Sequence, residues 1–289
     1  MFDVILIDFS WIYNKYYYVA KTRPNIEGHE QIDINIRVYD MLYRLFTLIE
    51  KSYSSAKFLL TLDSPLSATS NFILCSTYKQ NRNKEEKKEV YAAFKSIVGK
   101  LSQRLSNKFT FVRARGYEAD QVIAYLAEKY QEKYEVLIFT GDKDLLQLSY
   151  YSKVNISDKY EKGMFLIKTD EEIFGKFKNS KGEDFTRIST NKRDILKYRV
   201  LRGDTSDNLS PVFPRIKDIE IKSIIQEYWL DNEELTMERI EDILDDLRGS
   251  NNALAEKLSE SKDIWLRNYK IMNLYGLRDL PVKKVVQHA

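Results

Sequence analysis

Short apolar runs alternate, in the first half of the chain, with longer segments whose apolar residues recur every three or four positions. The short runs are typical of buried strands and lie at residues 2–8, 57–63, 109–113 and 134–140. The longer segments have the spacing of amphipathic helices and lie at residues 33–53, 85–107 and 118–132. This alternation predicts an α/β fold, with a mostly parallel central sheet and helices on both of its faces.

The pattern changes in the second half of the chain. A pair of short strands is expected at residues 153–157 and 163–168, turning through Lys162-Gly163. Further on, helices are expected at residues 189–202, 218–230, 236–248 and 253–275. We therefore expect an α/β domain over residues 1–190 and a helical region over residues 191–289. No linker rich in proline or serine separates them, so we expect the two to pack together.

Acidic residues stand where several predicted strands end. Asp8 ends the run FDVILID, Asp63 ends KFLLTLD, and Asp142 and Asp144 follow EVLIFTG. Because ligands of an open α/β sheet bind beyond the carboxyl ends of its strands, we expect these side chains to gather at one edge. Carboxylates held close together repel one another unless a hard cation neutralises them. The placement therefore predicts a site for Mg²⁺, or for Mn²⁺ in its place.

Composition excludes several other kinds of chemistry. One cysteine, Cys75, cannot form an intrachain disulfide, and His29 and His288 alone supply neither a zinc site nor a histidine-based triad. We expect Cys75 to be a small buried hydrophobic residue. No apolar stretch approaches the length of a membrane span, and the first residues lack the pattern of a signal peptide. We therefore expect a cytoplasmic protein with no membrane partner.

Charge is distributed unevenly along the chain. The net charge is only +3, but residues 79–108 carry nine lysines and arginines against three glutamates. A positive segment next to a negative metal site suits a polyanionic substrate that must contact both. The pattern therefore favours a nucleic acid, although a lysine-rich solvated helix is the commoner explanation of such a run.

Four motifs follow one another in order. They are LIDFS at 6–10, YKQNR at 78–82, GYEADQVIAYLA at 116–127 with TGDKDLLQL at 140–148, and LRGDTSDNL at 201–209. In this order and spacing the chain resembles the flap endonuclease and 5′-3′ exonuclease family, a 5′-nuclease superfamily with a PIN-like fold. Within it, the chain looks most like the ribonuclease H type of T-even bacteriophages. The resemblance implies a structure-specific 5′-nuclease that removes RNA primers and displaced flaps during replication or repair, in the host cytoplasm if the chain is phage-encoded.

The resemblance also implies which acids bind metal. One ion would be held by Asp8, Asp63, Glu118 and Asp120, and a second by Asp142, Asp144, Asp204 and Asp207. Two metals at a scissile phosphate stabilise the attacking and leaving oxygens, so hydrolysis needs no catalytic histidine. Asp8, Asp120 and Asp142 would then take part directly in catalysis. Taken singly, each acid could instead be a turn or helix-cap residue.

The YKQNR motif matches the base of a helical arch over the active site, here at about residues 78–107. By resemblance, Lys79 and Arg82 would contact the scissile phosphate and offset the charge that develops in the transition state. Lys84 would add a further nucleic-acid contact. Tyr78 would either stack on a base or belong to the core.

Two features of the sequence depart from the family pattern. Members of phage and bacterial type carry EADD, whereas Gln121 replaces the last acid here, so we expect altered affinity at one metal. Pro211 and Pro214 stand where a glycine-rich hairpin would grip duplex phosphates, which argues against a K⁺ site. Duplex contacts would fall instead to Arg202, Arg215, Lys217 and Lys222.

Two alternatives stay open at this point. A PIN-like ribonuclease would share the acids but lack the arch, and a binding module that has lost catalysis would retain the fold alone. The expected substrates are branched, nicked or flapped DNA and RNA/DNA. We expect a monomer, with a single-stranded DNA-binding protein or a replication clamp as a candidate partner.

Overall fold

The computed structural model describes residues 1–22, 33–64, 69–81, 84–105, 107–174, 176, 189, 191–230 and 233–285. The chain forms two compact units. Unit 1 consists of Met1–Ala68, Asn83–Lys168 and Leu274–Ala289, and unit 2 of Thr69–Arg82 and Thr169–Asn273. The chain therefore leaves unit 1 twice and returns to it twice. This division differs from the single boundary expected near residue 190, because an early segment and the final segment each join the other part.

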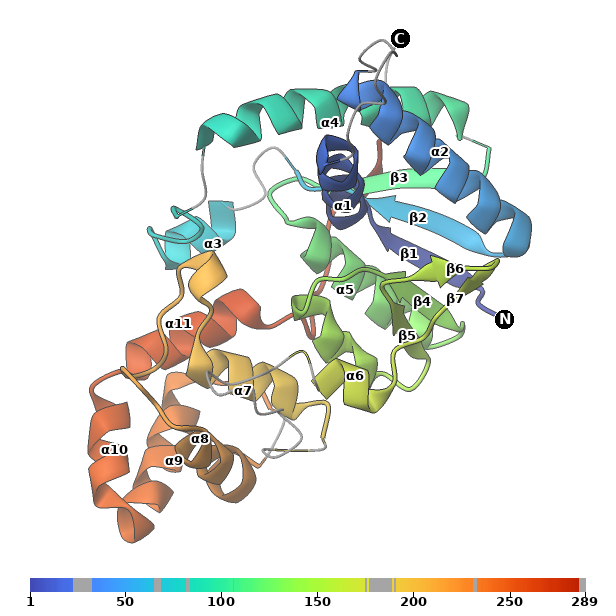
Figure 1. Ribbon diagram of the computed structural model, residues 1–289. Coiled ribbons are helices and arrows are strands. Elements are labelled where there is room, and N and C mark those ends of the chain that lie inside the picture. The colour runs from blue at the N-terminus through green and yellow to red at the C-terminus, as the bar shows by residue number, and fades with distance from the viewer. Residues whose placement is uncertain are drawn as a thin grey trace. The chain divides into compact units, whose positions relative to one another are not determined.

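Unit 1 is built on a six-stranded sheet with the order β5-β4-β1-β2-β3-β8 (Figure 1). Its strands are β1 Val4–Asp8, β2 Lys57–Thr61, β3 Phe109–Ala114, β4 Val136–Phe139, β5 Val154–Ser157 and β8 Val282–Lys284. The first five run parallel to their neighbours, and β8 pairs with β3 in the antiparallel sense. All five residues of β1 are buried, as expected for a strand covered on both faces.

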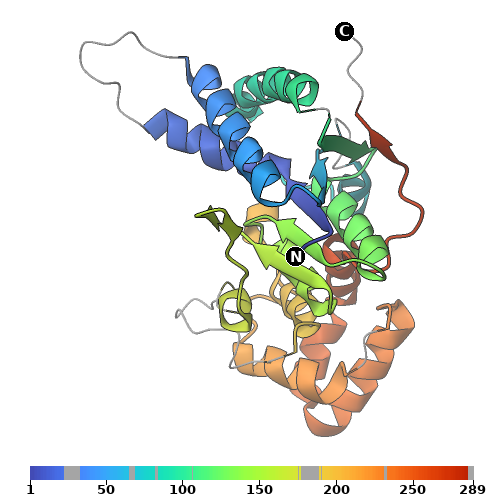
Figure 2. The same cartoon turned by 90° about the vertical axis from the view of Figure 1, so that its right-hand side faces the viewer.

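Helices cover both faces of this sheet, as predicted. One face carries α1 Phe9–Thr22, α2 Ile34–Ser52 and α4 Lys84–Arg104, and the other carries α5 Ala119–Gln131 (Figure 2). Ile5 and Ile7 of β1 alternate with Leu6, and only the first two join the core cluster beneath α1, α2 and α4. Strand β1 thus has apolar residues on both faces because each face is covered by helices.

The short strands after β4 differ in part from the expectation. The predicted turn is present, since Lys162 and Gly163 have φ values of 51° and 83° between β6 Tyr160–Glu161 and β7 Met164–Phe165. The predicted pairing of residues 153–157 with 163–168 is wrong. Residues 154–157 form β5, which extends the main sheet beside β4, because Val154 and Ile156 are buried there.

Unit 2 is helical. Its elements are α3 Thr69–Leu74, α6 Asp170–Phe174, α7 Asp194–Arg202, α8 Asp218–Ser223, the π-helical η4 Ile224–Tyr228, α9 Met237–Ser250, α10 Asn252–Ser259 and α11 Lys262–Met272. The single helix expected at residues 253–275 is two helices, with the break at Glu260 and Ser261. Trp229 and Trp265 are almost fully buried, and their ring centroids lie 5.6 Å apart.

Helix α7 lies at the centre of unit 2, and every residue from Asp194 to Leu201 is buried. Its polar residues have internal partners, as burial requires. The Lys197 ammonium donates to the Trp229 carbonyl oxygen at 2.6 Å and lies 3.4 Å from the Asp194 carboxylate. In both units, no helix of the part that the structure describes has the length and apolar character needed to cross a membrane.

The chain returns to unit 1 at Leu274. The backbone N–H of Leu274 donates to the side-chain oxygen of Gln147, and the Tyr275 hydroxyl donates to the Gln147 carbonyl at 2.6 Å. Gln147 belongs to the 3-10 helix η1 Asp144–Tyr150, and its side-chain amide donates to the Asp144 carbonyl at 2.9 Å. The returning segment therefore supports the turn that carries Asp144, before it ends in β8.

Candidate active site

The central strand of unit 1 ends in a buried carboxylate. Strand β1 lies between β2 and β4, so the strand order reverses there, and ligands of open α/β sheets bind at such a point. Asp8 is its last residue and is 6% exposed. The Trp11 backbone N–H donates to Asp8 Oδ1 at 3.0 Å, and the Thr140 hydroxyl donates to Asp8 Oδ2 at 2.8 Å. Thr140 follows β4, so its bond to Asp8 joins the ends of two neighbouring strands.

Burial dominates the electrostatics of the Asp8 carboxylate. Burial raises the pKa of Asp8 from 3.8 to about 7, the nearby carboxylates of Asp142 and Asp63 raise it further, and the bonds from Trp11 and Thr140 oppose the rise. The carboxylates of Asp142 and Asp63 are therefore close enough to disfavour the charged form of Asp8. A divalent cation would relieve both burial and repulsion, so these all-oxygen donors fit the predicted metal.

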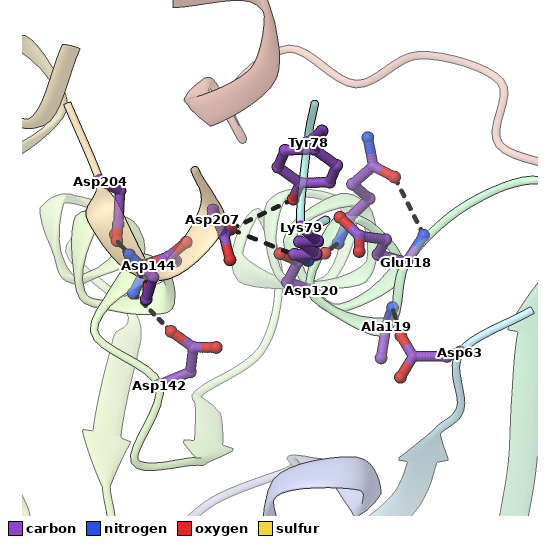
Figure 3. A network of polar contacts seen from close by, with 12 residues as sticks. Asp63, Tyr78, Lys79, Glu118, Ala119, Asp120, Asp142, Asp144, Asp204 and Asp207 are labelled. Carbon is purple, nitrogen blue, oxygen red and sulfur yellow. Dashed lines mark hydrogen bonds and ion pairs between the residues drawn. The ribbon is translucent and has the colours of Figure 1, made fainter. Parts of the chain in front are cut away.

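Three more of the predicted acids, one after β2 and two at a helix start, meet at the beginning of α5. Asp63, just beyond β2, accepts from the Ala119 backbone N–H at 2.8 Å (Figure 3). It also accepts from the Ser10 hydroxyl at 2.9 Å. Glu118 is the N-cap residue of α5 and is 7% exposed, and Asp120 lies in the first turn. Negative side chains are favoured at this end of a helix, because its N–H groups and dipole are positive there.

Gln121 has a defined structural partner. Its side-chain oxygen accepts from the Glu118 backbone N–H at 3.0 Å, which is one half of a capping box. The residue that replaces the family's last acid therefore stabilises the start of the helix that carries Glu118 and Asp120. This role was missed from the sequence, where the usual capping-box signal is S/T-x-x-E/Q and Glu118 replaces the serine or threonine.

Asp142 and Asp144 lie in the turn after β4. The Asp142 backbone N–H donates to the Thr140 hydroxyl oxygen at 3.0 Å, and the Asp144 N–H donates to Asp142 Oδ1 at 2.9 Å. Gly141 is required here, because a Cβ at this position would lie 2.5 Å from the Trp11 indole ring. Trp11 also packs edge-on against Phe139, at 5.9 Å between ring centroids. The indole thus fixes the turn that presents both acids.

Six of the eight predicted acids therefore belong to unit 1, at the ends of β1 and β2, at the start of α5 and in the turn after β4. Among the residues that the structure describes, no three acidic, histidine or cysteine side chains converge closely enough to form a complete metal cage.

The other two acids, Asp204 and Asp207, lie in a tight turn of unit 2. Asp204 and Leu209 exchange backbone hydrogen bonds of 2.9 and 2.8 Å across the 3-10 turn η3 Thr205–Asp207. Gly203 precedes the turn with φ of 71°, and a Cβ there would lie 2.5 Å from the Ser210 backbone. Glycine is therefore needed for this turn to close.

Both carboxylate oxygens of Asp204 have protein partners. Oδ1 accepts from the Ser206 backbone N–H at 2.9 Å and from its hydroxyl at 2.6 Å, while Oδ2 lies 3.1 Å from the buried Arg199 guanidinium. Asp204 thus caps the turn and neutralises a buried arginine. The helix pattern of residues 189–202 predicted that this segment would be helical, but not that Arg199 would face the turn.

Asp207 contacts the YKQNR motif. The Tyr78 hydroxyl donates to Asp207 Oδ2 at 3.2 Å, and the Lys79 ammonium lies 3.8 Å from the same oxygen (Figure 3). The Lys79 ammonium also lies 4.7 Å from the centre of the Tyr78 ring. Tyr78 is 6% exposed, so base stacking by this ring is corrected in favour of the core role. Cys75, three residues earlier, is buried, as expected.

The remaining predicted phosphate contacts differ from one another. Arg202 is held internally, because its guanidinium donates to the Ile216 carbonyl at 2.8 Å and pairs with Asp218. Arg215 and Lys217 are exposed on the loop before α8. Arg82 and the Lys84 side chain lie outside the described residues. The metal-binding role of the eight acids and the phosphate-binding role of the basic residues stay predictions.

Comparison with known proteins decides the family. The model of the 5′-3′ exonuclease N-terminal resolvase-like domain matches residues 3–178. This chain belongs to the 5′-3′ exonuclease family. Membership makes it a nuclease that hydrolyses phosphodiesters.

Individual relatives agree with this assignment. A 5′-3′ exonuclease of Mycoplasmopsis pulmonis is 26% identical over 280 residues, which cover 96% of this chain and 82% of the relative. A 5′-3′ exonuclease of Aquifex aeolicus is 30% identical over 191 residues, which are 65% of this chain and 57% of the relative. The structure of T5 5′-exonuclease with bound zinc has the same fold, with a TM-score of 0.65 and 17% identity over 94% of this chain and 89% of that one.

Proposed function

We propose that this 5′-nuclease depends on Mg²⁺ or Mn²⁺ and cleaves near the 5′ ends of flapped or nicked DNA and RNA/DNA. The buried Asp8 carboxylate supports the proposal most directly. Its pKa rises to about 7, with burial as the main cause and two neighbouring acids as contributors. A structural carboxylate would normally have a cationic partner at such a position, whereas Asp8 accepts its hydrogen bonds within the described residues from the neutral N–H of Trp11 and the hydroxyl of Thr140.

The solved neighbours support a divalent cation. T5 5′-exonuclease has been crystallised with bound zinc, and a T5 flap endonuclease with DNA and metal ions in one complex. In this chain, Asp8, Asp63, Glu118 and Asp120 would hold one ion, while Asp142 and Asp144, with Asp204 and Asp207 by the sequence prediction, would hold the other. When bound, such ions activate the attacking water and stabilise the leaving oxygen.

The protein's own residues would supply orientation and charge. The network of Thr140 and Trp11 holds both oxygens of Asp8, so its lone pairs keep a fixed direction toward the strand end. The start of α5 holds Asp63 in the same way. Lys79 would bind the scissile phosphate and offset its developing negative charge, with Arg82 as its partner by the sequence prediction.

The decisive assay compares three labelled substrates, a 5′ flap, a nicked duplex and a single-stranded RNA, each with Mg²⁺ or with EDTA. We expect metal-dependent cleavage of the flap and the nicked duplex. Asp142→Asn should abolish cleavage while substrate binding in Ca²⁺ is retained or tightened, since a negative charge near the phosphate is removed. Asp40→Asn, which alters an exposed acid on α2, is the matched control and should cleave normally.

Other outcomes would point elsewhere. Cleavage of single-stranded RNA alone would favour a PIN-like ribonuclease. Binding of flaps without cleavage in any divalent metal would favour a module that has lost catalysis. Normal turnover by Asp142→Asn in Mg²⁺ would refute the metal assignment.

A further inference from the structure

Two segments far apart in the sequence are joined by several hydrogen bonds within unit 2. The first is the turn of residues 77–81, which contains most of the YKQNR motif, and the second is the turn of residues 204–208, which contains Asp204 and Asp207. The Lys79 backbone N–H donates to the Asp207 carbonyl at 3.0 Å. The side-chain amide of Asn81 donates to the Thr205 carbonyl at 2.9 Å. This pair of bonds runs from the first turn to the second.

A third bond runs in the opposite direction. The side-chain amide of Asn208 donates to the Thr77 carbonyl at 2.9 Å, across 131 residues of sequence. The Tyr78 hydroxyl adds a fourth bond, to the Asp207 carboxylate at 3.2 Å. Because donors come from both segments and bond both backbone and side chain, neither turn can shift or rotate without breaking several bonds.

The backbone conformation of Lys79 shows why these hydrogen bonds are needed. Lys79 has φ of 54°, which lies in the left-handed region that a lysine occupies only with backbone strain. A residue in this region persists only when its surroundings hold it there. Lys79 is held by its own N–H bond to Asp207 and by the bonds at both ends of its turn. Asn208, with φ of 60°, also occupies this region, but asparagine tolerates it well.

We infer that Asn208 and Asn81 are positioning residues, which hold Lys79 in its left-handed conformation and its ammonium beside Asp207. The inference rests on the proposed function of Lys79 as a phosphate contact. Neither asparagine needs to contact substrate. Each acts through the turn of residues 77–81, so that the distance between the Lys79 ammonium and the Asp207 carboxylate is set by two side-chain amides that bind no metal.

One substitution removes only the bond from the Asn208 side-chain amide to the Thr77 carbonyl. Asn208→Gly keeps the left-handed backbone without strain and removes only the side-chain donor. Asn81→Ala removes the second donor independently. Asn251→Ala is the matched control, because Asn251 caps α10 in the same unit by accepting from the Leu254 N–H at 3.2 Å. It should lower the melting temperature without changing the rate of cleavage.

The first measurement is the single-turnover rate on a 5′ flap in Mg²⁺ at saturating enzyme. We expect Asn208→Gly and Asn81→Ala each to slow cleavage by about 10-fold or more, since a small misplacement of a charged group can cost as much as 10²-fold. Flap affinity in Ca²⁺ should change less than about twofold. In a Lys79→Ala background, Asn208→Gly should cause no further loss, because the group that it positions is already gone.

A second measurement does not depend on activity. Hydrogen–deuterium exchange of a peptide spanning residues 76–81 should rise in Asn208→Gly and not in Asn251→Ala, because the Lys79 N–H loses its protection. Unchanged exchange there, wild-type rates in both variants, or an additive loss with Lys79→Ala would each overturn the inference. Failure of the wild-type protein to cleave flaps would instead count against the proposed function, and the exchange result would still decide the positioning role.

Discussion

Replacing Asp8 with asparagine should stabilise the metal-free protein while abolishing its activity. The pKa of Asp8 is raised from 3.8 to about 7, chiefly by burial, with the Asp142 and Asp63 carboxylates adding to the effect. A carboxyl group with a raised pKa stabilises the fold fully at pH values below its unfolded pKa. That stabilisation is lost as pH rises from about 4 to about 7, because the folded protein must then carry a buried charge.

The magnitude follows from the size of the shift. About three pKa units correspond to roughly 4 kcal/mol over the whole window, and the part between about pH 5.5 and 7 to roughly 2 kcal/mol. In a chain of this size, each kcal/mol corresponds to roughly 2 °C in melting temperature. In EDTA, the advantage of Asp8→Asn over the wild type should therefore be about 4 °C larger at neutral pH than at about pH 5.5. Asparagine can retain the acceptor for the Trp11 N–H and donate its amide to the Thr140 oxygen, so the site loses charge without losing both bonds.

The assay is a pair of thermal melts, wild type and Asp8→Asn, in EDTA from about pH 5.5 to 8, repeated in Mg²⁺. The advantage of the variant should grow with pH in EDTA, level off above about pH 7, and reverse in Mg²⁺, because only the wild type gains from the ion. A variant that is less stable than the wild type in EDTA at about pH 8 would show that the carboxylate is not destabilising. The same result would remove the main support for a metal at this strand end.

Three further predictions concern the surrounding residues. Lys79→Ala and Arg82→Ala should each slow single-turnover cleavage by about 10²-fold with little change in affinity, and a pure affinity defect would reassign them to ordinary phosphate contacts. Gln121→Asp should restore an acid and lower the Mg²⁺ concentration for half-maximal cleavage, whereas Gln121→Ala should only lower the melting temperature through the lost cap bond. An unchanged Mg²⁺ titration in the first would refute a metal-tuning role. Gly141→Ala should cut the cleavage rate at least about 10-fold because its Cβ would meet the Trp11 ring, and adding Trp11→Leu should restore part of it. Equal activity of the single and double variants would exclude that contact as the cause.

Strand-end acids could be predicted because the sequence determines them locally. Asp8 and Asp63 each end an apolar run, and a parallel sheet brings such ends to one edge. The partners of these acids could not be predicted in the same way. Thr140 bonds Asp8 across 132 residues and Trp11 packs on Gly141, and neither pairing has a periodic signal in one sequence.

The same limit applies to the helical part. The amphipathic pattern of residues 236–248 predicted α9 closely, since one apolar face suffices for a helix on a surface. It failed for residues 253–275, where apolar residues on both sides of Ser261 hide a break between two helices. The left-handed backbone of Lys79 could not be predicted from the sequence either, because lysine has no preference for a positive φ. The bonds that hold it come from residues 204–208, which are distant in the sequence.

The late return of the chain to unit 1 has a consequence for protein synthesis. Leu274 and Tyr275 support Gln147, and residues 282–284 cover the free edge of β3, yet the ribosome makes them after all of unit 2. Until then, a nascent chain has an open strand edge and an unsupported turn at Asp144. Nuclease competence should therefore arise only once these residues have left the ribosome, so that a stalled or prematurely ended chain is inert toward nearby nucleic acid. A chain ended at residue 273 would test this, since it should bind metal weakly and cut no flap.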